Sequence, residues 1–68
     1  MDEAAFNHSL RQLLKRFGVT AQREVEKQVD AGIRGGALAG RRSLSARITL
    51  ELDGGGAPVV VQGEIALE

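Results

Sequence analysis

Apolar positions in the first quarter of the chain recur with helical spacing. Asp2 is suited to cap a helix, and Glu3 adds a negative charge where the helix dipole favours one. Basic residues then gather before Gly18, a residue typical of helix ends. The pattern predicts a helix over about residues 3–17, with an apolar stripe formed by Phe6, Leu10, Leu13, Leu14 and Phe17.

A second helix is predicted over about residues 21–33. Thr20 is a candidate N-cap, and apolar residues follow at every fourth position, at Ala21, Val25, Val29 and Ile33. The arrangement is similar to a DNA-binding helix-turn-helix. The motif needs apolar residues where Glu24 and Lys27 stand, so we interpret the segment as a plain helical hairpin.

The next residues, 34–43, are interpreted as a connector, because glycines there disfavour a continuous helix. Its glycine spacing is that of a phosphate-binding P-loop, but the Lys and the Ser or Thr that such a loop needs are replaced by Arg41-Arg42. We therefore expect a flexible link.

Strict alternation of apolar and polar residues marks the last third of the chain. Residues 44–52 alternate with period two, which predicts a half-buried strand. A glycine-rich turn over 53–57 leads to Pro58 and a second strand, in which Gly63 suggests either a bulge or a close backbone approach. Residues 44–68 are thus predicted to form a β-hairpin.

The predicted fold class is α+β, with two N-terminal helices packed on one face of a C-terminal two-stranded antiparallel β-hairpin in a single small domain, residues 1–68. The hairpin's apolar face needs a cover, and the helices are the available one. The expected core is Phe6, Leu10, Leu13, Leu14, Phe17, Val25, Val29, Ile48, Leu50, Val59, Val61 and Ile65.

Composition argues against several functional classes. The chain of 68 residues has no Cys and one His, so thiolate and His-cluster metal sites are excluded. His8 has no acid or nucleophile at helical spacing, and two helices and a hairpin leave little room for a pocket. We expect a non-enzymatic protein with no catalytic residue, no cofactor and no metal. The acidic start and the lack of a long apolar run favour a cytoplasmic protein that spans no membrane.

Charge is unevenly distributed although the formal net charge is zero. Residues 31–50 carry four Arg and no acid, and residues 51–68 carry four acids and no base. One interpretation is internal compensation, and the other is an anion-binding patch formed by Arg34, Arg41, Arg42 and Arg47. Acids on the second predicted helix would repel phosphates, which makes nucleic acid the less favoured partner.

The second predicted strand offers a partner edge. Its valine run, residues 59–61, is typical of a strand contacted on both faces. Because a two-stranded hairpin leaves its edges unpaired, we expect Val60, Gln62 and Glu64 to form an edge for another protein or a second copy. The favoured function is a protein-interaction module, and the alternative is a weak nucleic-acid or anion binder that uses the Arg-rich connector.

Three stretches carry a resemblance: Phe6-Asn7, the segment Gly18-Val19-Thr20-Ala21-Gln22-Arg23-Glu24-Val25-Glu26-Lys27, and the ending Gly63-Glu64-Ile65-Ala66-Leu67-Glu68. In them the chain resembles a family of short bacterial proteins of unknown function. The resemblance implies a small stand-alone bacterial, cytoplasmic protein. It implies no activity, cofactor or catalytic residue.

Overall fold

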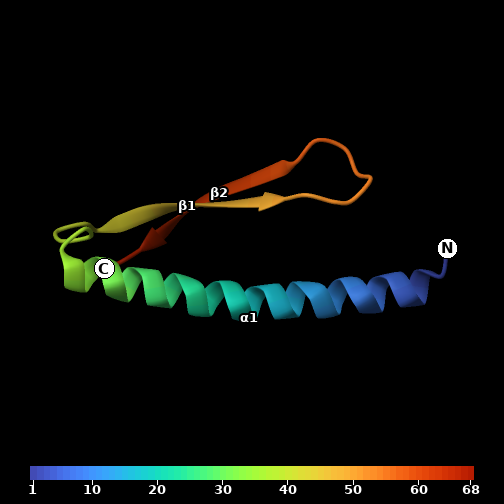
Figure 1. Ribbon diagram of the computed structural model, residues 1–68, viewed down its shortest axis with the longest axis horizontal. Helices are drawn as coiled ribbons and strands as arrows, with labels where there is room; N and C mark the ends of the chain where they lie inside the picture. The colour runs from blue at the N-terminus through green and yellow to red at the C-terminus, as the bar shows by residue number, and fades with distance from the viewer.

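A computed structural model describes all 68 residues as one helix followed by a β-hairpin. The helix α1 spans Glu3–Gly35, and the strands β1 and β2 span Ser43–Leu50 and Val59–Ala66. Figure 1 shows the hairpin folding back along the helix from its C-terminal end. The predicted α+β class with an antiparallel hairpin is confirmed, but the prediction of two helices is wrong.

The helix runs without a break through the predicted turn. Gly18, Val19 and Thr20 are all helical, so Gly18 is not a C-cap and Thr20 is not an N-cap. One glycine inside a helix costs only about 1 kcal/mol relative to alanine. Ala21 follows Leu14 by seven residues and Val25 follows Leu14 by eleven, which are about two and three helical turns. The apolar face therefore continues across Gly18, and this favours one helix.

Replacing Gly18 with alanine should stabilise the protein. A Cβ atom at Gly18 would meet no other heavy atom within 4 Å, so the gain in helix propensity is not offset by a clash. The expected increase in the free energy of unfolding is about 0.5–1 kcal/mol, measured by thermal or urea unfolding followed by circular dichroism at one protein concentration. A decrease would show that a neighbour packs closely on Gly18.

Both helix ends are capped. The Asp2 carboxylate accepts a hydrogen bond of 3.0 Å from the Ala5 N–H, as predicted for an N-cap. At the other end Gly36 adopts φ = 86°, a left-handed conformation that favours glycine, and its N–H donates to the Ile33 carbonyl. The connector is therefore residues 36–42, shorter than predicted, because the helix continues through Gly35.

The connector returns to the helix through a close approach at Gly32. The Leu38 N–H donates to the Gly32 carbonyl at 3.0 Å. A Cβ atom built on Gly32 would lie 2.7 Å from Leu38 Cδ1, so the Leu38 side chain occupies the space that a larger residue would need. This contact sets where the hairpin leaves the helix.

The hairpin has a regular register from Ser43 opposite Ala66 to Leu50 opposite Val59. Gly63 pairs directly with Ala46, so the bulge predicted at Gly63 is absent. Leu67 N–H donates to the Arg42 carbonyl at 2.8 Å and extends the pairing by one residue. The first strand ends at Leu50, two residues earlier than predicted, and a loop over 51–58 joins the strands.

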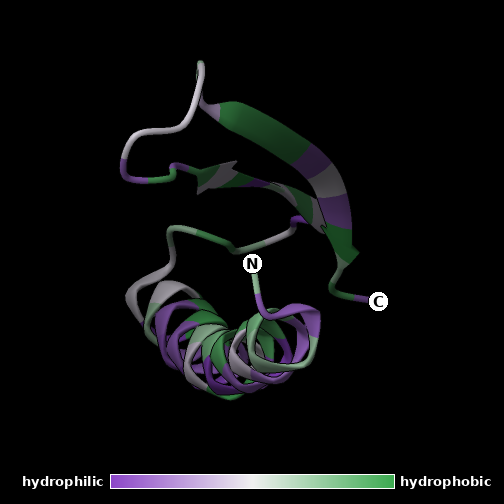
Figure 2. Ribbon diagram, turned by 90° about the vertical axis from the view of Figure 1, so that its right-hand side faces the viewer, coloured by the Kyte–Doolittle hydropathy of each residue, from purple (hydrophilic) through white to green (hydrophobic).

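The molecule is two open layers, with the hairpin above the helix (Figure 2). Its extents are 51 × 23 × 18 Å and its radius of gyration is 16.0 Å, against about 11 Å for a compact domain of this length. No residue is buried, so the predicted core of twelve apolar residues is wrong for a single chain. Most of the half-buried apolar side chains gather where the connector joins the layers, at Val29, Leu38, Leu44, Ala46, Ile65 and Leu67, and Ala21 on the helix is half-buried as well.

Candidate interaction surface

The hairpin turns one apolar face toward the helix. Alternation along β1 puts Leu44, Ala46, Ile48 and Leu50 on the same face. The register sets Leu44 opposite Ile65, Ile48 opposite Val61 and Leu50 opposite Val59, so the β2 residues share that face. The opposite face carries mostly polar side chains, among them Arg47 and Glu64.

The helix turns an apolar face toward the hairpin. Val25 and Val29 line a cavity together with Leu44 and Ile65, which shows the direction of this face. Leu14 lies about three helical turns before Val25 and about two turns before Ala21. All three residues therefore lie on the same face of the helix. We call the space between these two faces, lined by Leu14, Ala21, Val25 and Val29 on α1 and by the inward residues of β1 and β2, the apolar slot.

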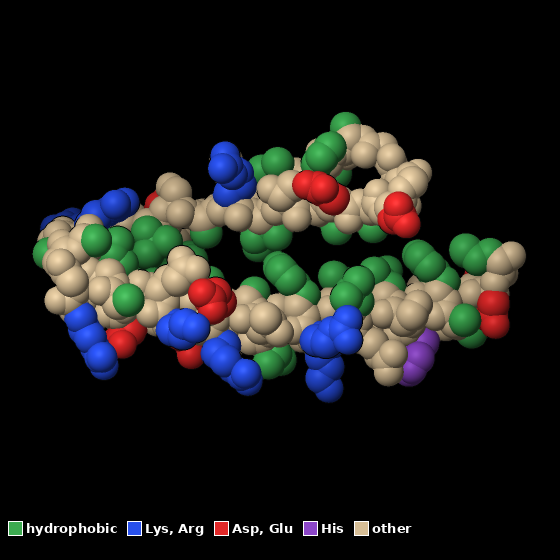
Figure 3. All heavy atoms as spheres, viewed as in Figure 1, with side chains coloured by type: hydrophobic (Ala, Val, Ile, Leu, Met, Phe, Trp, Pro, Cys, Tyr) green, Lys and Arg blue, Asp and Glu red, His purple; other side chains and the backbone are tan.

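The apolar slot is open. No Cα atom of α1 lies within 8 Å of a Cα atom of either strand. The cavity at the closed end has a volume of about 420 Å³. Toward the hairpin loop the layers separate, and Figure 3 shows apolar side chains facing one another across empty space. Leu14 on one wall is 54% exposed and Val61 on the other is 60% exposed.

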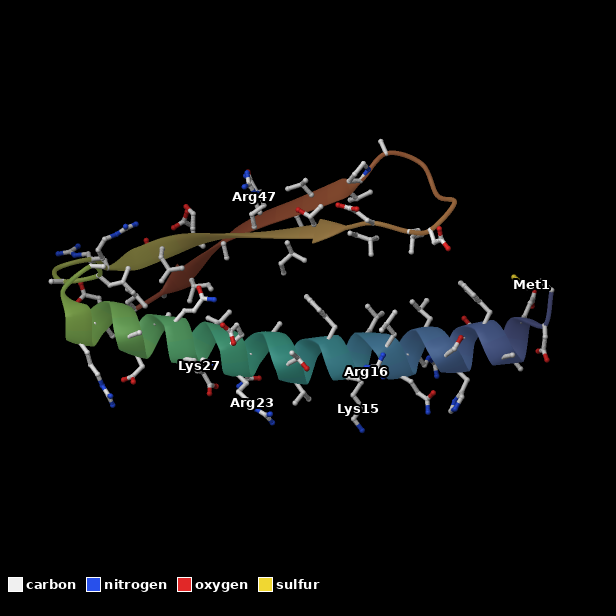
Figure 4. All side chains as sticks on the ribbon, in the orientation of Figure 1. Met1, Lys15, Arg16, Arg23, Lys27 and Arg47 are labelled. Atoms are coloured by element: carbon white, nitrogen blue, oxygen red, sulfur yellow. The ribbon has the colours of Figure 1, made fainter.

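Charged side chains lie mainly outside the two layers. In Figure 4, Lys15 and Arg23 point away from the hairpin, and Arg47 points away from the helix. The outer surface of α1 carries ion pairs between Lys27 and Glu24 at 3.7 Å and between Arg34 and Asp30 at 3.2 Å. The molecule is therefore amphipathic in both layers, with the apolar sides turned inward.

The family model described as a family of unknown function (DUF6494) matches residues 1–68, the whole chain. The protein belongs to the DUF6494 family. No curated protein and no solved structure matches the chain. The expected resemblance to a family of unknown function is confirmed, and no activity is attached to that family.

The four candidate arginines of the DUF6494 chain come from α1, the connector and β1. Arg34 pairs with Asp30 below the helix, and Arg42 Nε lies 3.2 Å from a Glu68 carboxylate oxygen. Arg41 and Arg47 make no ion pair, and Arg47 lies on the outer face of the hairpin (Figure 4). Two of the four guanidinium groups are thus already opposed by a carboxylate.

The candidate edge of DUF6494 lies along β2 at Val60, Gln62 and Glu64. Because Leu67 donates to Arg42, ladder alternation directs the backbone N–H and C=O groups of these three residues away from β1. The Glu64 carboxylate accepts hydrogen bonds from the Ser43 and Ser45 hydroxyls at 3.1 and 2.9 Å. This polar cluster holds the two strands together on the outer face and leaves the β2 backbone edge open.

One titratable group in DUF6494, Glu24, has a shifted pKa. The pKa of Glu24 is lowered, first by a hydrogen bond from Gln28 and then by the charge of Lys27. The Glu24 side chain is 53% exposed on the helix, so this is a surface effect. No group of three His, Cys, Asp or Glu side chains is placed to hold a metal ion. The helix α1 lacks an uncharged apolar stretch of the length that spanning a membrane requires.

The slot is the feature that residue patterns did not reveal. Several of its lining residues, among them Leu14, Val25 and Val29, were predicted to form a closed core, because two short helices could fold over the hairpin. One pattern in the sequence indicated the open arrangement: Leu14, Ala21 and Val25 lie on the same face if the helix continues through Gly18. This spacing predicts one continuous helix. A single straight helix can pack against a hairpin along one side only.

Proposed function

We propose that this DUF6494 protein is a non-enzymatic protein-interaction module whose binding surface is the apolar slot. One observation carries the proposal: two apolar walls face each other, yet no residue of the chain is buried. Exposed apolar surface of this extent is typical of interaction sites, because leaving it in water is costly. The proposed setting is bacterial and cytoplasmic, as expected from the sequence.

The slot supports this proposal better than the connector supports anion binding. Desolvation of apolar side chains gives affinity that responds little to salt, whereas phosphate binding by cations weakens steeply as salt rises. Arg34 and Arg42 are paired with carboxylates, so an anion would have to displace Asp30 and Glu68. Binding through the β2 edge is compatible with the slot, because the edge borders the same hairpin.

The test compares capture of proteins by matched variants. Leu14→Asp places a charge in the slot, and Val19→Asp places the same charge on the outer surface of α1, where Val19 is already 53% exposed. We expect a stoichiometric partner, this chain or another protein, to be retained by wild type and Val19→Asp and to be lost at least tenfold with Leu14→Asp. Retention should be equal at low and moderate salt.

A third variant addresses the connector. Arg41→Glu combined with Arg42→Glu should leave slot binding unchanged. If capture is lost with this double variant and with added salt, but survives Leu14→Asp, the protein is an anion binder and the slot proposal is wrong. Circular dichroism of each variant separates loss of binding from loss of folding.

A further inference from the structure

A second apolar stripe on α1 is directed beside the slot. Phe6, Leu10, Leu13 and Phe17, which we call the flank stripe, are between 39% and 52% exposed. At 3.6 residues per turn their mean direction lies about 80° around the helix from that of the slot residues Leu14 and Val25. The strands extend above the helix with no Cα atom within 8 Å of an α1 Cα atom, so the flank stripe is left exposed within the single chain.

The flank stripe is self-complementary when read in reverse. Its spacings are four, three and four residues, and its residue types are Phe, Leu, Leu and Phe. An antiparallel second copy sets Phe6 against the partner's Phe17 and Leu10 against the partner's Leu13, twice over by symmetry. Such reciprocal contacts are the defining property of a two-fold interface, and four-three spacing is that of helices packed side by side.

Antiparallel pairing also closes the slot. For two helices side by side, a two-fold axis perpendicular to them keeps both hairpins on the same face of the pair. A two-fold axis along the helices places the hairpins on opposite faces. Both arrangements set the N-terminal half of the partner's helix beside the end of the slot that lies under the 51–58 loop, but only the first also brings the partner's hairpin to the same face. The four apolar surfaces then enclose one core.

The area of exposed surface fits a dimer of this kind. The chain exposes 6167 Å², whereas a folded monomer of its mass exposes about 4,100 Å². Covering the difference of about 2,000 Å² on each of two chains would bury about 4,000 Å² in total, within the range of obligate homodimers. Zero net charge adds no long-range repulsion between copies.

We propose that the occupant of the apolar slot is a second copy of this chain, packed antiparallel through the flank stripe. The inference rests on the proposed use of the slot as a binding surface and names its partner. The folded unit is then a two-fold dimer of one helical layer and one hairpin layer, in which each copy completes the core of the other.

Solution mass and one distance test the inference. The chain of 7.2 kDa should sediment at twice that mass at micromolar concentration. The chain has no cysteine, so Arg23→Cys supplies a single site for a nitroxide label on the outer surface of α1. Electron double resonance should give an inter-label distance of about 35 Å or more for antiparallel helices centred on the flank stripe, and about 20 Å for parallel ones.

Matched variants locate the contact. Leu13→Asp in the flank stripe should weaken dimerisation at least 100-fold, whereas Val19→Asp should leave the mass unchanged. A dimer that survives Leu13→Asp, a parallel distance or a larger assembly overturns the inference. A wild-type chain that is helical at 7.2 kDa also overturns it. The proposed function still stands in that case if another protein binds wild type and not Leu14→Asp, and it fails if Leu14→Asp changes nothing.

Discussion

The unfolding temperature of this protein is expected to rise with its concentration. An unfolded chain of 7.2 kDa exposes about 10,400 Å², so the folded single chain, at 6167 Å², has removed only about 40% of its surface from water. A domain of about 60 residues normally removes about 60%. The missing burial must come from association, and association couples folding to concentration.

The size of this effect follows from mass action. Each tenfold increase in concentration stabilises a folded dimer by about 1.4 kcal/mol. For an entropy of unfolding typical of two such chains, this corresponds to about 5 °C in the midpoint. Thermal melts followed by circular dichroism over a hundredfold concentration range should therefore shift by about 10 °C.

A control separates association from ordinary stabilisation. Gly18→Ala should raise the midpoint at every concentration without changing the dependence on concentration, because it alters helix propensity alone. A midpoint that stays constant over the hundredfold range would show that the single chain folds without a partner. That result would contradict the dimer.

Gly32→Val should detach the hairpin from the helix. A Cβ atom at Gly32 would lie 2.7 and 2.8 Å from Leu38 Cδ1 and Cγ, well inside van der Waals contact. Valine adds two further methyl groups, so Leu38 must leave its position against the helix. Overpacking of this kind costs about 1–3 kcal/mol, and the hairpin loses the contact that positions it at the closed end of the slot.

The matched control is the same substitution at Gly18, which has no neighbour within 4 Å. Gly18→Val should leave stability unchanged or slightly improved, since valine is a better helix former than glycine. Hydrogen exchange should then show faster exchange of β1 and β2 amides in Gly32→Val alone. Equal stability of the two variants would show that Leu38 moves aside without cost.

The strands were predictable because a strand's pattern is local. Alternation from Leu44 onward and the glycine-rich turn identify two antiparallel strands, and the pairing of Leu44 with Ile65 follows once the turn is placed. Of the two alternatives at Gly63, the bulge is absent, because a glycine in a strand interior fits regular pairing as well as a bulge. Its backbone geometry alone distinguishes the two.

The helix was predicted in two parts because Gly18 has the local chemistry of a helix end. The energetic cost of one glycine is small beside the gain from keeping Leu14 and Val25 on one face. Candidate site residues were harder still to predict. The separation of Arg34 from Arg47 and their different neighbours depend on the path of the connector, which no spacing in the sequence specifies.

The sequence by itself determined the chemistry of each surface in this protein. It set the apolar stripes, the polar faces, the cap at Asp2 and the pairing of the strands, since each depends on residues close in sequence or opposite in one hairpin. Only the tertiary structure decided that a single 33-residue helix lies beside the hairpin without closing on it. The physical reason is length: a straight helix about 50 Å long cannot fold back over a shorter hairpin, so its apolar side remains open for a second surface.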